Sequence, residues 1–121
     1  MPIKHILLAS TFAIAAVTTA GAQAHAKLES SEPQAAATLD NAPKEIRLKF
    51  NEALEPAFSK IKLTDASNTD VPLAAAKVDG ADARTMMAPA PALRAGVYHI
   101  QWSTMTHDGH KAKGEFAFTV K

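Results

Sequence analysis

The sequence predicts an all-β fold, a small Greek-key β-sandwich or barrel of the immunoglobulin-like type. In its longest patterned stretches, apolar side chains alternate with polar ones, which is typical of half-buried strands. Proline, glycine, asparagine or aspartate bounds each stretch, and such turn signals recur about every ten residues. The chain has 121 residues, the length of about one domain, so we expect a single sandwich without a linker or internal repeat.

About seven short segments carry a strand pattern. In chain order they are residues 45–50, 60–63 and 71–73, a short segment at Val78, and residues 84–88, 98–104 and 115–120. In the first, Ile46, Leu48 and Phe50 share one face while charged residues share the other. The third contains a proline, which has no amide proton for a neighbouring strand, so we expect it at a sheet edge.

The expected core comes mainly from the first strand and the last two. Its members are Ile46, Leu48, Phe50, Tyr98, Ile100, Trp102, Phe116 and Phe118. Two alanine-rich stretches, residues 34–38 and 74–77, favour helix by composition but are too short to form one alone. We therefore expect loops with local turns at both.

Residues 1–24 have the layout of a secretory signal peptide. A basic start is followed by an apolar run and then by small residues suited to cleavage. A membrane anchor is the less favoured alternative, because the run is mostly alanine and threonine in its second half. Three cuts satisfy the small-residue rule, and only the cut after Ala24 makes His25 the first residue. We expect residues 25–121 to form the exported domain.

Charge and cysteine content exclude several classes of function. The 13 Lys and Arg residues against 12 Asp and Glu give a formal net charge of +1, so a nucleic-acid partner is not expected. The chain has no cysteine, which excludes a disulfide framework, a thiolate nucleophile and a thiolate metal site. It also lacks a glycine-rich phosphate loop and the usual hydrolase motifs. Any bound metal must take nitrogen, oxygen or thioether ligands.

The segment between the last two strands concentrates candidate metal ligands. Asp108 and His110 are two residues apart, so in an extended backbone they project from the same side, while His107 projects from the other. A solvated Asp-Gly turn is an equally good interpretation of this segment alone. An N-terminal His25 would add its α-amine and its ring Nδ1 to one ion. The resulting nitrogen and oxygen set suits tetragonal Cu(II).

The sequence resembles the CopC family of periplasmic copper-binding proteins over essentially all of residues 25–121. The most specific matches are the histidine at the cleavage site and the Asp-x-His before the last strand. The matching residues are His25-Ala26, Leu28, Ser31-Glu32-Pro33, Leu39, Ala42-Pro43, Ile46, Leu48, Phe50-Asn51-Glu52, Ala95-Gly96, Tyr98, Trp102, Asp108-Gly109-His110, Gly114 and Phe118.

The resemblance implies a CopC-type sandwich that binds one Cu(II) per chain through His25, Asp108 and His110. It also implies a non-enzymatic periplasmic protein that sequesters or carries copper for resistance, homeostasis or uptake. The implied partners are the copper ion and an inner-membrane copper transporter of the CopD type. We expect the protein to be a monomer.

Other residues of interest fall outside the matched motif. His107 stands beside it, and we expect a surface histidine there, with a secondary metal ligand as the alternative. Some members of the family carry a methionine-rich Cu(I) loop, but here only Met86 and Met87 occupy that region, without a nearby histidine. We expect one of them to be buried and the other exposed on a strand. We expect His99 to be structural or exposed.

Four glutamates, Glu29, Glu32, Glu52 and Glu55, have no histidine or nucleophile at motif spacing. We expect them to lie on solvated faces.

Two other classes of function compete with the copper carrier. A histidine-brace copper oxidase or monooxygenase also uses an N-terminal histidine on a β-sandwich. The short chain and the anionic ligand Asp108 argue against this enzyme, because the carboxylate would stabilise Cu(II) and occupy a position that oxygen needs. A metal-free structural sandwich would explain the strands but not the three candidate ligands. Zinc would also accept two histidines and a carboxylate.

Overall fold

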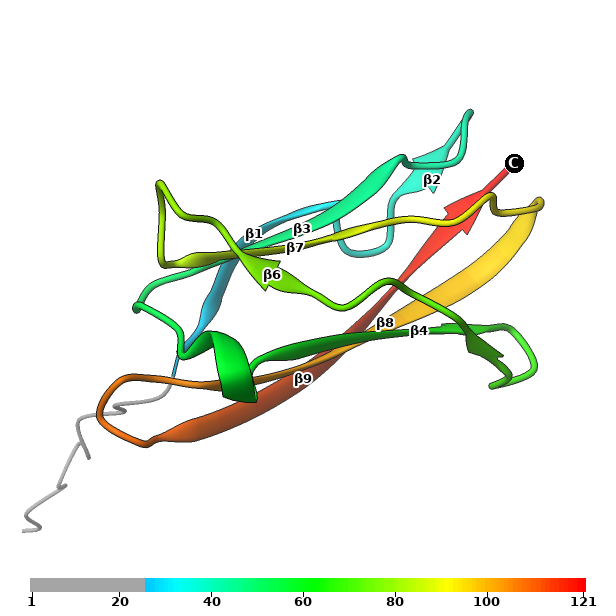
Figure 1. The fold of residues 1–121 in the computed structure, drawn as a ribbon. Helices are drawn as coiled ribbons and strands as arrows, with labels where there is room; N and C mark the ends of the chain where they lie inside the picture. Colours follow the sequence, from blue (N-terminus) through cyan, green and yellow to red (C-terminus); the bar gives the residue numbers. More distant parts are fainter. Residues whose placement is uncertain (1–25) are drawn as a thin grey trace, which may run out of the picture.

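The computed structural model describes residues 26–121, and it confirms the all-β sandwich (Figure 1). Within these residues, one sheet has the strand order β1-β3-β7-β6 and the other has the order β2-β9-β8-β4-β5. The elements are β1 (Leu28–Glu32), β2 (Thr38–Leu39), β3 (Glu45–Phe50), the 3-10 turn η1 (Pro56–Phe58), β4 (Lys60–Asp65), β5 (Asp70–Val71), β6 (Lys77–Val78), β7 (Thr85–Pro89), β8 (Gly96–Met105) and β9 (Lys111–Val120). The expected signal peptide, residues 1–24, lies outside the described residues, as does His25.

The strands with clear apolar alternation lie where the sequence places them. The segment 45–50 coincides with β3, and β8 and β9 extend the last two expected strands into an antiparallel ladder ten residues long on each side. The proline-containing segment 71–73 contributes only its first residue, in the edge strand β5.

Two strands were not expected from the sequence. β1 is mainly polar and pairs with β3, so backbone hydrogen bonds at a sheet edge, more than apolar burial, place it there. β2 is two residues long and pairs in parallel with the end of β9. The alanine-rich stretches contain no helix, although Thr38 and Lys77 at their ends belong to short strands.

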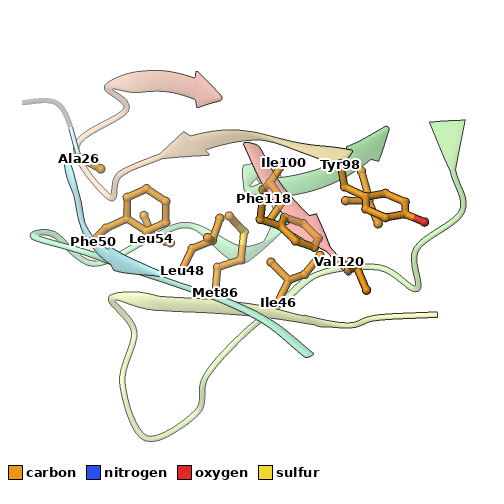
Figure 2. Packing of buried hydrophobic residues seen from close by; sticks show 11 residues of the cluster. Ala26, Ile46, Leu48, Phe50, Leu54, Met86, Tyr98, Ile100, Phe118 and Val120 are labelled. Atoms are coloured by element: carbon orange, nitrogen blue, oxygen red, sulfur yellow. The ribbon is translucent and has the colours of Figure 1, made fainter. Parts of the chain in front are cut away.

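The core fills the space between the two sheets (Figure 2). Most of the expected core side chains are buried, and Met86, Leu54 and Leu63 join them. Trp102 and Phe116, also expected in the core, are partly buried and pack against it. No helix in the described part of the chain has the length and apolar character needed to cross a membrane.

Trp102 lies at the end of the core that is nearest the β8–β9 loop. Its ring meets Phe50 edge to face, with centroids 4.9 Å apart and planes at 70°. Across the ladder Trp102 pairs with Gly114, and a Cβ atom built on Gly114 would lie only 2.4 Å from Cζ2 of the indole. The ring occupies the space that a side chain at position 114 would need.

We therefore predict that Gly114→Ala destabilises the fold by about 1–3 kcal/mol, because the indole must shift against Phe50. Urea unfolding measures this change. Gly80→Ala is the matched control, since nothing lies within 4 Å of a Cβ atom at that position. Equal stability of the two variants would show that the indole moves without cost.

Candidate metal centre

The β8–β9 loop, residues 106–110, is a tight turn. The Thr106 amide donates to the His110 carbonyl at 3.0 Å, and the Gly109 amide donates to the Thr106 carbonyl at 2.9 Å. Gly109 has a φ of 87°, a left-handed conformation that glycine adopts without steric cost. The extended backbone expected for Asp108 and His110 is therefore wrong, because these two hydrogen bonds close the segment into a turn.

The turn nevertheless brings Asp108 and His110 together. His110 Nδ1 lies 2.8 Å from Asp108 Oδ2, and the His110 backbone amide donates to Asp108 Oδ1 at 3.4 Å. Both side chains are about half exposed, at 48% for His110 and 53% for Asp108. An imidazole and a carboxylate thus lie side by side at an accessible position, and both are ligand types that Cu(II) and Zn(II) accept.

The electrostatics of the turn keep Asp108 ionised. The hydroxyl of Thr106 donates to Asp108 Oδ1, and this hydrogen bond is the main cause that lowers the Asp108 pKa from 3.8 to about 2. His110 lowers the pKa further. Thr106 is only 2% exposed, so its hydroxyl is shielded from water. At neutral pH the carboxylate carries its full charge, as a metal ligand must.

His107 has a different partner from its neighbours in the turn. Its Nδ1 contacts the carboxylate of Glu55, which the sequence placed on a solvated face. The Glu55 amide also donates to the Met105 carbonyl at 2.8 Å, and Leu54 forms an isolated antiparallel bridge with Thr106. Glu55 therefore contacts the turn through its carboxylate. The sequence gives no signal for this contact, because 52 positions separate the two residues.

The described chain begins at the same end of the sandwich. Ala26 is 3% exposed and belongs to the core cluster with Leu54. The Lys27 amide donates to Asn51 Oδ1 at 2.7 Å, and the Asn51 amide donates to the Lys27 carbonyl at 3.0 Å. Figures 1 and 2 both place this start beside the β8–β9 loop. His25 is the residue that immediately precedes this anchored start, and it lies outside the described residues.

The remaining candidates lie elsewhere. Met86 is fully buried in β7 as expected, whereas Met87 is partly buried, so the expectation that it is exposed is wrong. His99 Nδ1 lies 3.4 Å from Glu115 Oε1 on the β8–β9 ladder, which agrees with a structural role. Among residues 26–121, no three histidine, aspartate or glutamate side chains gather in a group suited to holding a metal ion.

Comparison with known proteins gives a consistent result. The family model described as the CopC domain matches residues 28–121. "Protein YobA" of Escherichia coli K12 is 36% identical over 115 residues, which cover 91% of this chain and 93% of that protein. "Copper resistance protein C" of Pseudomonas syringae pv. tomato is 37% identical over 116 residues, covering 91% of each.

Solved structures agree with the sequence relatives. The crystal structure of CopC from Methylosinus trichosporium OB3b superposes with a TM-score of 0.76 at 31% identity, and covers 80% of this chain and 94% of that chain. PcoC from Escherichia coli, described as a methionine-rich copper resistance protein, superposes with a TM-score of 0.68 at 41% identity. That match covers 81% of this chain and all of the other, at 100%.

We predict that Thr106→Val raises the Asp108 pKa from about 2 toward 3.8, because the valine cannot donate the hydrogen bond that stabilises the carboxylate. A carbon-detected NMR titration of the side-chain carboxyl in the metal-free protein measures the change. Thr64→Val is the matched control, since the buried Thr64 hydroxyl has no hydrogen-bond partner within residues 26–121. An unchanged Asp108 pKa in Thr106→Val would contradict the assigned cause.

Proposed function

Because the chain belongs to the CopC family, we propose that it binds copper and serves in copper resistance or homeostasis. The observation that carries the proposal is the contact between Asp108 and His110 at the end of the sandwich where the described chain begins. Relatives named copper resistance proteins, at 34–39% identity over most of the chain, support the copper assignment.

We propose that His25, Asp108 and His110 are the ligands of one Cu(II) ion per chain. The α-amine and ring Nδ1 of His25 would supply two nitrogens, His110 a third, and Asp108 an oxygen. The burial of Ala26 and the two hydrogen bonds between Lys27 and Asn51 support this set, because they fix the chain directly after His25. Nitrogen and oxygen donors in a tetragonal arrangement favour the oxidised ion.

The proposed cellular role follows from the same residues. Cleavage after Ala24 would release residues 25–121 into the periplasm as a monomeric copper carrier, without enzymatic activity. The copper would be sequestered there or passed to an inner-membrane transporter of the CopD type. The His25 amine and imidazole must lose protons to bind the ion, so copper affinity should fall in acid.

We predict that Asp108→Ala and His110→Ala each weaken Cu(II) binding by about 100-fold or more. Even the substitution of residues that only hydrogen-bond to metal ligands lowers metal affinity by about 10- to 100-fold. Both residues are exposed, so the fold should persist. Electron paramagnetic resonance of the copper-loaded variants should show an altered tetragonal signal. His107→Ala and Met87→Leu are the controls and should preserve that signal. Loss of the signal in His107→Ala, with retention in His110→Ala, would show that the ligands are assigned to the wrong side of the turn.

The role of the amine predicts that a chain carrying one extra methionine before His25 binds Cu(II) at least about 100-fold more weakly, because the amine becomes an amide without a usable lone pair. Competition with a chelator of known Cu(II) affinity measures the difference. The control is the same chain after an aminopeptidase has removed the methionine, which should restore tight binding. Equal affinities would exclude the amine as a ligand.

A further inference from the structure

Two adjoining hollows lie on the five-stranded sheet, beside the β8–β9 loop. One, of about 630 Å³, is lined by Lys60, Lys62 and Trp102 among others, and the second, of about 660 Å³, is lined by Phe58 and Lys111 among others. They share Lys60, Ser103 and Lys113, which sit in one row across β4, β8 and β9. We call this surface the lysine groove and define it by Phe58, Lys60, Lys62, Lys111 and Lys113.

The lysine groove concentrates positive charge on a chain whose total is only +1. Lys62 is paired with Asp70 at 3.2 Å, and the one acidic residue lining the groove, Glu115, has its Oε1 atom 3.4 Å from His99 Nδ1. Lys60, Lys111 and Lys113 make no ion pair within residues 26–121. Three uncompensated cations on one side of the sheet attract an anionic partner and repel a cationic one.

An aromatic side chain stands among these cations. Phe58 is 59% exposed, and it is one of two large hydrophobic residues that are exposed in the described chain. It sits on η1, none of whose residues is buried, and it lines the hollow together with Lys60 and Lys111. Exposed aromatic residues next to charged ones are typical of the anchor points of protein interfaces.

The groove adjoins the proposed copper ligands. Lys111 follows His110 directly, and η1 follows Glu55, whose carboxylate contacts His107. We propose that the lysine groove binds an acidic, extended segment of a partner protein. One apolar side chain of that segment would contact Phe58. A partner held there would lie beside Asp108 and His110. The link to copper transfer rests on the proposed function, whereas the docking itself requires no copper.

The shape of the surface favours a polypeptide over a lipid bilayer. The two hollows share Lys60, Ser103 and Lys113, so a chain that lies along both would meet Lys62 first, then Lys60 and Lys113, and then Lys111. A bilayer surface is flat over this scale and would leave the two hollows unfilled, whereas an extended polypeptide can fill them. The chemistry therefore points to an acidic segment of protein.

The test is an NMR titration of the copper-free protein, expressed from its full-length sequence, with a synthetic peptide of aspartate and glutamate around one phenylalanine. We expect amide shifts centred on Lys60, Ser103 and Lys113. The double substitution Lys60→Glu/Lys113→Glu should weaken peptide binding by about tenfold or more. The matched control, Lys44→Glu/Lys77→Glu, makes the same charge change away from the groove, at two exposed lysines that form no ion pair within the described chain. It should weaken binding less than about threefold.

Three outcomes would overturn the docking proposal. Equal weakening by the control pair would mean that only net charge attracts the peptide. Equal binding of a peptide with serine in place of phenylalanine, or no effect of Phe58→Ser, would remove the apolar contact. Binding to phosphatidylglycerol vesicles but not to the peptide would assign the surface to a membrane. Because the titration uses copper-free protein, each outcome is independent of whether His25, Asp108 and His110 bind copper.

Discussion

The connector formed by residues 51–55 is the constraint on which the proposed site depends. Its first residue, Asn51, exchanges two hydrogen bonds with Lys27, and its last two residues pair with the β8–β9 loop through the Leu54–Thr106 bridge and the Glu55 contacts. One short segment therefore fixes both the start of the described chain and the loop that carries Asp108. The β1–β3 pairing, which sets Leu28 opposite Phe50, acts with the connector to hold the start of the described chain at this end of the sandwich.

Buried side chains of the core hold the connector in position. Phe50 immediately precedes the connector, is fully buried and meets Trp102 edge to face, while Gly114 leaves room for the indole. Leu54, also buried, anchors the far end of the connector. The turn that carries Asp108 and His110 is shaped by its own hydrogen bonds, and both of these side chains are about half exposed.

The sequence predicts what depends on local pattern and misses what depends on tertiary contact. The alternation of Ile46, Leu48 and Phe50 is enough to predict β3, whereas polar β1 is defined by its pairing with β3. Asp108 and His110 do lie together, but through a turn instead of an extended strand. The contact of Glu55 with His107 joins distant parts of the chain, so no spacing rule could reveal it.

We propose that a free amine at His25 completes a copper site with Asp108 and His110. It is tested most directly by intact mass spectrometry, under conditions that preserve bound metal, of the protein recovered from the periplasm of cells that express the full-length sequence. We expect a chain that begins at His25 and carries one copper ion. A chain that begins at Gln23 or at Lys27 and still carries one copper ion would contradict it.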